Sequence, residues 1–317
     1  MAERRYPGTV LEFEAEFATE EACRAYLEQT RWPDGFVCPA CGCGRGWQVA
    51  RGGLWFCAAC SRQTSVTAGT IFEGTRKPLR MWFRAMWLVT NQKHGVSALG
   101  LQRALGLRSY ETAWAWLHKL RRAMVRPGRD RLAGRVEVDE SYVGGVEKGV
   151  HGRQTFTKAI VAIAVETEDR GFGRVRLQRI ADVTAESLEP FVSSTVEPGS
   201  TVCTDGWGGY GRLARLDYKH EVVNIKASGD PAHVLLPAPH RVASLLKRWW
   251  LGTHQGAISR RQLDYYLDEF TFRFNRRRSR RRGMLFYRLV QQAVATEPVP
   301  LKSLISSRPQ GTEGSEE

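Results

Sequence analysis

Two pairs of cysteines near the N-terminus have the spacing of metal ligands. Each pair is a CxxC motif, and residues 42–56 lie between the two. The four are Cys38, Cys41, Cys57 and Cys60. Thiolate pairs spaced in this way can close a tetrahedron around zinc. Because so short a ribbon lacks the apolar side chains for a core of its own, we predict a structural Zn²⁺ that contributes folding free energy. Cys43 leaves one ligand open, since it could replace Cys41.

Two aspartates follow segments that have the character of strands. In RVEVDESYVGG (135–145), the alternation from Val136 predicts a strand that ends on Asp139. Residues 200–205 predict a second short strand, which ends on Asp205. Two such strands, with a helix between them, can bring both carboxylates to one edge of a sheet. Carboxylates that close repel unless cations lie between them, which is the situation in two-metal phosphoryl transfer.

The charge balance indicates an anionic partner. Lys and Arg together number 47 against 33 Asp and Glu, which gives a formal net charge of +14. Nucleic acid is the first candidate and an anionic membrane the second. The sequence has no apolar run of about 18 residues and no signal-peptide core at the N-terminus, so we expect a cytosolic protein without a membrane partner. The seven cysteines, five of them at 38–60, favour metal binding in a reducing compartment over disulfides.

Residues 76–128 have the pattern of short helices. The middle portion resembles a helix-turn-helix, in which Ser97 caps one helix, Gly106 marks the turn, and Ser109 with Thr112 begins the next helix. Small polar residues at that position can reach phosphates or base edges. Packing of three helices without a DNA role is the alternative. The basic end of the last helix favours nucleic acid, and it comprises His118, Lys119, Arg121 and Arg122.

The order of elements after residue 129 predicts one mixed α/β (α+β) domain. Three successive strands, at 135–139, 158–166 and 173–182, precede a helix at 187–196 and the strand that leads to Asp205. This order, followed by helices, is the pattern of an RNase H-like nuclease fold. The predicted organisation is a helical segment (1–30), a zinc ribbon (31–75), a helix-turn-helix-like region (76–128), an RNase H-like catalytic domain (129–297) and a disordered tail (298–317).

Several motifs together resemble a known family. They are CPACG, QTSVTAGTIFEGTRKPLRMWFRAMW, VEVDESYVGG, TDGWGGY, HRVASLLKRWWLGTHQGAIS and LDEFTFRFNRRRSR. Their combination resembles the zinc-ribbon transposases of bacterial insertion sequences that carry an RNase H-like DDE domain, over residues 30–292. The resemblance implies DNA strand cleavage and joining at transposon ends, with Asp139 and Asp205 as ligands of catalytic Mg²⁺ or Mn²⁺. It also implies double-stranded end and target DNA as partners, and at least a dimer on DNA.

The third catalytic ligand departs from the Asp-Asp-Glu pattern of these relatives. The resemblance implies a Glu or Asn, sometimes a His, seven residues before a lysine on a helix; here Lys247 points to His240. Seven residues are about two helical turns, so the two side chains can share a face. An imidazole binds Mn²⁺ more readily than Mg²⁺, which prefers oxygen. Glu269 is the competing candidate, and we favour His240.

Basic residues late in the chain are candidates for DNA contact. Lys247 and Arg248 can grip the substrate phosphate beside the metals. Six arginines follow Asn275 in a run that can hardly be buried and would neutralise several phosphates. They are Arg276, Arg277, Arg278, Arg280, Arg281 and Arg282. A solvated patch or a targeting segment is the alternative for this run.

Other functional classes remain possible on the sequence. A non-catalytic zinc-ribbon and helix-turn-helix regulator explains the charge and the ribbon, but it leaves both aspartates without a purpose. A related RNase H-like nuclease would cut DNA without joining it. A degraded, inactive copy is a further alternative, although no expected segment is missing. The sequence specifies neither the terminal repeat nor the target preference.

Overall fold

The computed structural model describes residues 6–49, 53–126, 128–145, 147, 155, 157–169, 171–224, 228–229, 231–256 and 258–305. The chain forms two compact units: residues up to 126 together with those from 279 onward, and residues 127–278. Most of the predicted disordered tail, 306–317, lies outside the described residues. The start of that segment is helical, in α12 (Leu301–Ile305), where Leu304 is buried. The predicted tail therefore begins too early.

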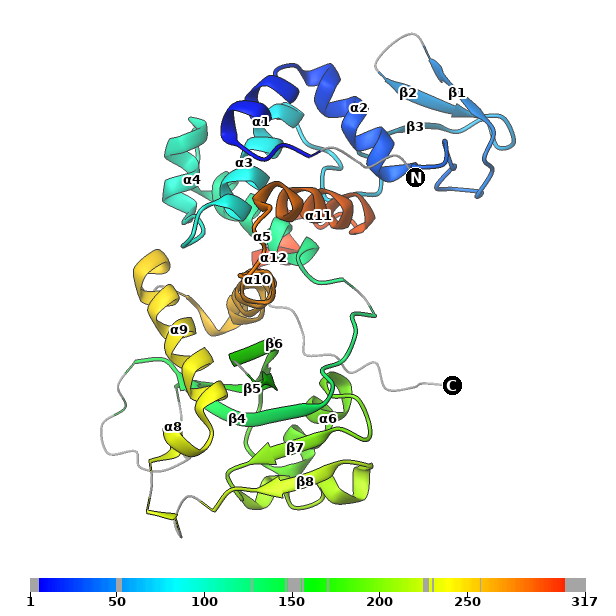
Figure 1. The fold of residues 1–317 in the computed structure, drawn as a ribbon. Coiled ribbons are helices and arrows are strands. Elements are labelled where there is room, and N and C mark those ends of the chain that lie inside the picture. Colours follow the sequence, from blue (N-terminus) through cyan, green and yellow to red (C-terminus); the bar gives the residue numbers. More distant parts are fainter. Residues whose placement is uncertain are drawn as a thin grey trace. The chain divides into compact units, whose positions relative to one another are not determined.

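The first unit is a set of helices around an aromatic core (Figure 1). Its helices are α1 (Val10–Glu16), α2 (Glu20–Arg31), α3 (Leu79–Asn91), α4 (Ala98–Leu105), α5 (Tyr110–Ala123), α11 (Arg282–Ala295) and α12. Phe286 of α11 contacts Phe17 and Phe83, with ring centroids 5.5 Å and 5.7 Å away. The predicted catalytic domain extended to residue 297, but the apolar face of α11 packs against α2 and α3 of this unit.

A small antiparallel sheet in the first unit carries the cysteines. It has the order β1-β2-β3, from β1 (Gly46–Val49), β2 (Leu54–Cys57) and β3 (Gln63–Ser65). A Cβ at Gly46 would lie 2.6 Å from the Phe56 carbonyl oxygen and from the Phe36 ring, so only glycine fits there. Phe36 in turn stacks on Trp55 with centroids 4.9 Å apart. The sheet thus has little more than one aromatic layer for a core.

The helix-turn-helix pattern is present with the predicted caps. Ser97 accepts a hydrogen bond from the Gly100 amide at 3.0 Å and begins α4, and Ser109 accepts one from the Glu111 amide at 3.1 Å and begins α5. Gly106 ends α4 in the left-handed conformation, at φ 61°. The prediction that the basic end of α5 faces nucleic acid is wrong for two of its residues, because His118 and Arg121 are only 0% and 1% exposed.

The second unit contains a five-stranded mixed sheet, as predicted for an RNase H-like fold (Figure 1). Its order is β6-β5-β4-β7-β8, from β4 (Arg135–Val143), β5 (Ala159–Glu168), β6 (Gly171–Ile180), β7 (Thr201–Thr204) and β8 (Lys219–Val222). The first three strands are antiparallel neighbours, whereas β4, β7 and β8 run parallel. The edge strand β8 has no counterpart in the sequence prediction, because it is short, polar and mostly exposed.

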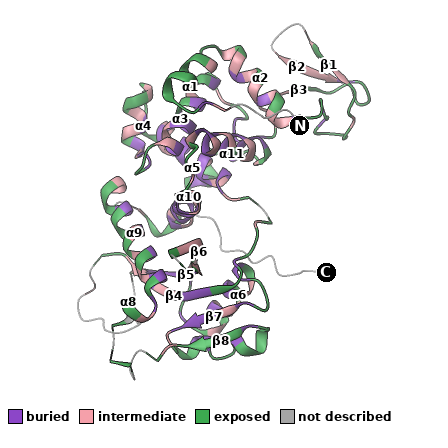
Figure 2. Ribbon diagram, in the orientation of Figure 1, coloured by how far each residue is buried: buried purple, intermediate pink, exposed green. Residues whose placement is uncertain are grey.

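Helices cover both faces of this sheet. One face packs on α6 (Ala185–Thr195), which contributes Leu188, Phe191 and Val192. The other packs on α9 (Pro237–His254) and α10 (Leu263–Asn275). Burial from both sides accounts for the continuous apolar sequence of β5, and Figure 2 shows the buried colour along the central strands. Short elements complete the unit: η1 (Gly208–Tyr210), η2 (Leu213–Leu216), α8 (Ala232–Leu235) and η3 (Arg260–Gln262).

Candidate active site

The four CxxC cysteines form one compact cluster. Their sulfur atoms all lie within 4.8 Å of one another, and the Cys38–Cys60 and Cys41–Cys57 sulfur pairs are 3.7 Å and 3.6 Å apart. A zinc ion with Zn–S bonds of about 2.3 Å requires sulfur–sulfur edges of about 3.8 Å, so the residues fit this metal. Amide hydrogen bonds, first that of Cys60, lower the pKa of Cys57 to about 6 and favour the thiolate that binds metal.

Cys43 lies outside this cluster. Its sulfur accepts a hydrogen bond from the Arg45 amide at 3.4 Å instead. The pairing of Cys41 with Cys57 leaves no place for Cys43 in the tetrahedron.

Asp139 lies in the middle of β4 and does not end it. Residues 140–143 continue the ladder with residues 159–162 of β5, so the strand runs on to Val143. The predicted strand end is therefore wrong: the alternation could not show how far the β4–β5 hairpin extends. The parallel pairing of β4 with β7, in contrast, stops at Glu137 opposite Cys203. Asp139 thus lies two residues beyond the last pair.

Asp205 immediately follows β7, which ends one residue earlier than predicted, at Thr204. Continuing the Glu137–Cys203 register by two residues brings Asp205 level with Asp139. Level residues of parallel neighbours point to the same face of a sheet, and such strands lie about 4.8 Å apart. The Asp205 carboxylate accepts a hydrogen bond from the Trp207 amide at 3.0 Å, which fixes the turn after the strand. The two aspartates therefore present their carboxylates to one face.

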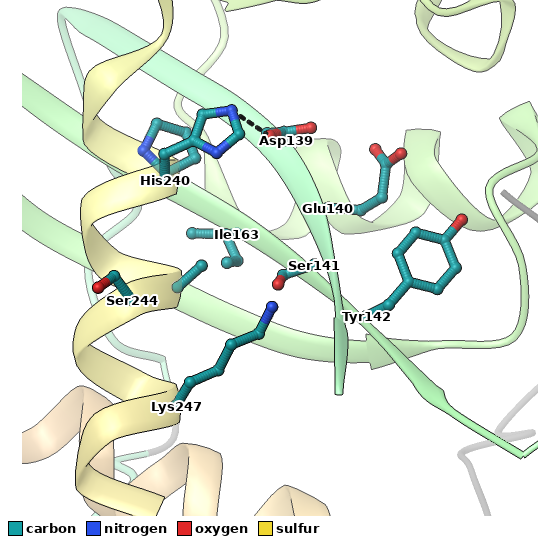
Figure 3. Close-up of a pocket in the computed structure, with 10 residues that line it drawn as sticks. Asp139, Glu140, Ser141, Tyr142, Ile163, His240, Ser244 and Lys247 are labelled. Atoms are coloured by element: carbon teal, nitrogen blue, oxygen red, sulfur yellow. Dashed lines mark ion pairs between the residues drawn. The ribbon is translucent and has the colours of Figure 1, made fainter. Parts of the chain in front are cut away.

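Helix α9 adds His240 on that face. Its Nε2 atom lies 3.5 Å from Oδ2 of Asp139 (Figure 3). Burial lowers the pKa of His240, as do the charges of His233 and Lys247, while Asp205 opposes them. At neutral pH the imidazole is therefore uncharged and offers a lone pair, the form that binds a metal.

Lys247 lies two turns further along α9, on the same side of the helix. His240 and Lys247 both line a cavity of about 510 Å³ together with Asp139 and Ser141. In Figure 3 the Lys247 side chain points toward Ser141 of β4. Burial lowers the pKa of Lys247, and the nearby charge of Lys158 adds to this effect. The shared face of His240 and Lys247 follows the predicted spacing.

Glu269 does not line this cavity. It lies on α10 and is 1% exposed. His240, in contrast, lies 3.5 Å from Asp139. That His240 and not Glu269 is the third ligand stays a prediction.

Tyr210 lies beside the candidate site, although the sequence analysis assigned it no role. Its hydroxyl donates to Glu140 at 3.2 Å, and its pKa is raised by burial and then by the charges of Glu140, Asp139 and Asp205. A Cβ at Gly209 would meet the Val183 carbonyl oxygen at 2.5 Å, so glycine lets η1 press this tyrosine toward the carboxylates. The TDGWGGY motif contains this tyrosine, and the close approach to Val183 explains its Gly209.

The carboxylate–imidazole site is more open than the cysteine cluster. Among the described residues only the four cysteines bring their ligand atoms within 4.8 Å of one another. The ligand atoms of Asp139, Asp205 and His240 are therefore spread more widely. Asp139 and His240 line the cavity, whereas Asp205 is not among its lining residues, although its charge acts on His240. Two carboxylates and one neutral imidazole are ligands that suit Mn²⁺, and Mg²⁺ less well.

Comparisons with known proteins identify relatives of both units. Residues 131–275 match the family model of the ISXO2-like transposase domain, and residues 18–63 match the transposase zinc-ribbon domain. The chain belongs to the insertion-sequence transposases that carry an N-terminal zinc ribbon. This transposase is also 28% identical, over 280 residues, to an uncharacterized protein in transposable element ISH50 of Halobacterium salinarum; the match covers 81% of this chain and 91% of that protein.

The arginine run of the transposase is only partly exposed. Arg276 lies over the Phe272 ring at 4.0 Å, and Arg277 donates to the carbonyl oxygens of Phe172, Gly173 and Phe274. Arg278 forms an ion pair with Glu168 at 2.7 Å. None of the six arginines is buried, as predicted, but the first three make contacts within the protein and hold the β5–β6 hairpin against α10.

Other predicted DNA contacts are exposed. Arg248 is exposed on α9, and Arg280 and Arg281 are exposed just before α11, where Arg282 is half-buried. None of the helices in the described part of the chain is both long and apolar enough to span a membrane.

Proposed function

We propose that this transposase binds the ends of its insertion sequence and catalyses metal-dependent DNA cleavage and strand transfer at Asp139, Asp205 and His240, beside the cavity that Asp139 and His240 line. The observation that carries the proposal is the parallel pairing of β4 with β7: Asp139 and Asp205 each lie two residues beyond its last pair, and His240 lies 3.5 Å from Asp139. A regulator that only binds DNA has no need of this arrangement.

The chemistry is in-line displacement at phosphorus. In cleavage, a water oxygen bonds to phosphorus as the bond to the 3′-oxygen breaks, which leaves a 3′-hydroxyl and a 5′-phosphate. In strand transfer, that 3′-hydroxyl attacks a phosphorus of target DNA and releases a target 3′-hydroxyl. Divalent cations bound by Asp139, Asp205 and His240 would supply charge stabilisation and a more acidic nucleophile. The Lys247 ammonium group would hold a non-bridging oxygen of the phosphate.

Recognition of the ends falls to the first unit in this proposal. The N-terminal turn of α5 presents Tyr110, which is 53% exposed, beside the cap residue Ser109. The ribbon presents Trp47, which is 55% exposed and stacks on Phe56 with centroids 4.8 Å apart. Exposed aromatic and small polar groups of this kind suit contact with DNA. Pairing two ends would require at least two copies of the chain.

The test is cleavage of duplexes that carry the end of the element, in Mn²⁺ and in Mg²⁺. Asp139→Asn and Asp205→Asn should each lower the cleavage rate at least about a thousandfold, which corresponds to some 4 kcal/mol of lost transition-state stabilisation. Binding to the same duplex should persist. Asp169→Asn, at an exposed turn of the same unit, is the matched control and should cleave normally.

The alternatives predict different products. A DNA-binding regulator would bind the duplex without cutting it, and an RNase H-like nuclease would cut without joining the end to target DNA. Undiminished cleavage by either aspartate variant would overturn the assignment of the site.

A further inference from the structure

A second cavity adjoins the candidate active site within the same unit. It measures about 700 Å³ and shares Tyr142 and Lys247 with the first cavity. Figure 3 shows both side chains in the close-up of the first cavity: Tyr142 follows Ser141 on β4, and Lys247 reaches toward Ser141 from α9. We call this second space the flanking cavity. Its walls come from the end of β4, the start of β5, the end of α9 and η3.

The flanking cavity is cationic. Among its described lining residues are Lys158, Lys247 and Arg260, and none of those described is an aspartate or a glutamate. The charges of Lys158 and Lys247 are close enough to interact, because Lys158 contributes to the lowered pKa of Lys247. Two ammonium groups that repel one another at a shared cavity favour an anion between them.

The remaining walls are largely apolar. Val143, Leu251 and Ile258 line the cavity, and Leu251 is 66% exposed on α9 although it is a large hydrophobic residue. Trp250 closes the wall behind it and stacks on Tyr266. A space with cations on one side and apolar groups on the other matches a nucleotide, which has an anionic phosphate and an apolar face on its sugar and base.

The backbone around Lys158 is built to hold it in place. The Glu147 carboxylate accepts hydrogen bonds from the Thr155 hydroxyl at 2.9 Å and from the amides of Thr157 and Lys158 at 2.6 Å and 2.7 Å. Glu147 therefore binds the backbone of this segment. Gly144 also packs closely against this residue: a Cβ at Gly144 would lie 3.1 Å from Cα of Lys158, and Gly144 has a φ of +153°. Gly144 thus lets Lys158 approach the end of β4 beside the cavity.

We propose that the flanking cavity binds the stretch of DNA strand next to the scissile phosphate, with Lys158 and Arg260 holding neighbouring phosphates and the apolar wall taking a sugar or base. The inference rests on the proposed function, since it takes the first cavity as the place where the phosphate reacts. It assigns a role to the Gly144–Gly145 pair and to a face of α9 that cleavage chemistry alone does not use.

The test measures DNA binding by the full chain without divalent cations, so that no cleavage takes place. Lys158→Gln and Arg260→Gln should each weaken binding to an end duplex about tenfold and reduce the slope of log affinity against log salt by about one. Lys219→Gln removes an exposed charge on β8, outside both cavities, and should change neither quantity. Thermal unfolding checks that each variant is folded, and Lys158→Arg should restore binding.

Neutral methylphosphonate linkages identify the phosphates. Placed one at a time on either side of the cleavage position, they should weaken wild-type binding at one or two linkages, and the penalty at one of them should vanish in Lys158→Gln. Folded Lys158→Gln and Arg260→Gln variants with wild-type affinity, salt slope and linkage penalties would overturn the inference. A wild-type chain that shows the linkage pattern but never cleaves would support the flanking cavity and count against the proposed function.

Discussion

The two candidate metal sites of this chain are built in opposite ways. The cysteine cluster comes from one short segment, and its sulfur atoms are already at the edge length of a zinc tetrahedron. The carboxylate–imidazole site takes one residue each from β4, from the end of β7 and from α9, and it opens into a cavity. A closed set of ligands suits a structural ion, whereas an open one leaves room for a substrate.

The two sites also differ in how much apolar core surrounds them. The ribbon sheet has three short strands and few buried side chains apart from its cysteines and Phe36. The sheet of the second unit has an apolar cluster on each face. The metal should therefore hold the ribbon together, while the catalytic sheet should fold without any ion.

Loss of zinc should unfold the ribbon and spare the catalytic sheet. Cys57→Ser, or a strong chelator, removes a metal-binding free energy on the order of 10 kcal/mol from a segment with little core. Amide hydrogen exchange should become fast over β1–β3 and stay slow over β4 and β5, and bound zinc should fall below one equivalent. Cys43→Ser is the control and should keep its zinc. Slow exchange in the ribbon of Cys57→Ser would contradict the contrast.

Substitutions of Glu269 and of His240 should have opposite effects: the first should lower stability and the second should lower activity. Glu269 is 1% exposed, so Glu269→Ala should lower the free energy of unfolding by about 1–3 kcal/mol without abolishing the cleavage of end duplexes. His240→Ala should do the reverse, because its imidazole faces the cavity. Thermal unfolding and cleavage rates in Mn²⁺ measure both quantities. Loss of activity in the glutamate variant alone would make Glu269 the third ligand.

The same contrast explains what the sequence could predict. The ribbon cysteines and the caps Ser97 and Ser109 depend on neighbours only a few residues away, so the local pattern was sufficient. The position of Asp139 within β4 depends on how far β5 pairs beyond it, which local alternation does not encode. Arg277 likewise seemed to belong to an exposed run, but it finds carbonyl partners in a distant hairpin.

Helix α11 shows the same limit at the scale of domains. Its apolar periodicity predicts a helix, and the structure contains one. The unit in which it packs depends on the matching aromatic face of α2 and α3, which lie far earlier in the chain, at residues 20–31 and 79–91. Family resemblance added the function, since it linked the aspartates to DNA cleavage before any contact was known.

Unlike the ribbon, the sheet of the second unit should depend for its stability on contacts within the protein and not on a metal. One such contact joins Glu166 and Arg174. The Glu166 carboxylate accepts from the Arg174 side chain at 2.6 Å and from the Ala133 amide at 3.0 Å. Burial alone would raise the pKa of Glu166, but these hydrogen bonds outweigh it and lower the pKa. A lowered folded-state pKa stabilises the fold above the unfolded value, near pH 4.3, and the gain is lost as pH falls below it.

Glu166→Gln should therefore cost about 1 kcal/mol at pH 7, where the half-exposed arginine limits the effect, and progressively less as the pH falls below about 4. Chemical denaturation of the second unit at several pH values measures this difference. A chelator should leave it unchanged, because no metal takes part in the pair. A cost that grows toward acid pH would contradict the assigned direction of the shift.

The smallest predicted change is in the stability of Asp139→Asn. Above neutral pH the His240 imidazole is uncharged, so Asp139 gains little from it, while the level carboxylate of Asp205 repels it. Removing the charge should shift the free energy of unfolding by no more than about 0.5 kcal/mol, even though it abolishes cleavage. Mn²⁺ should raise the melting temperature of the wild type by binding the folded state, and not that of Asp139→Asn. Equal stabilisation of both by Mn²⁺ would show that the ion binds elsewhere, and a large loss of stability would mean that this site, like the ribbon, holds its own fold together.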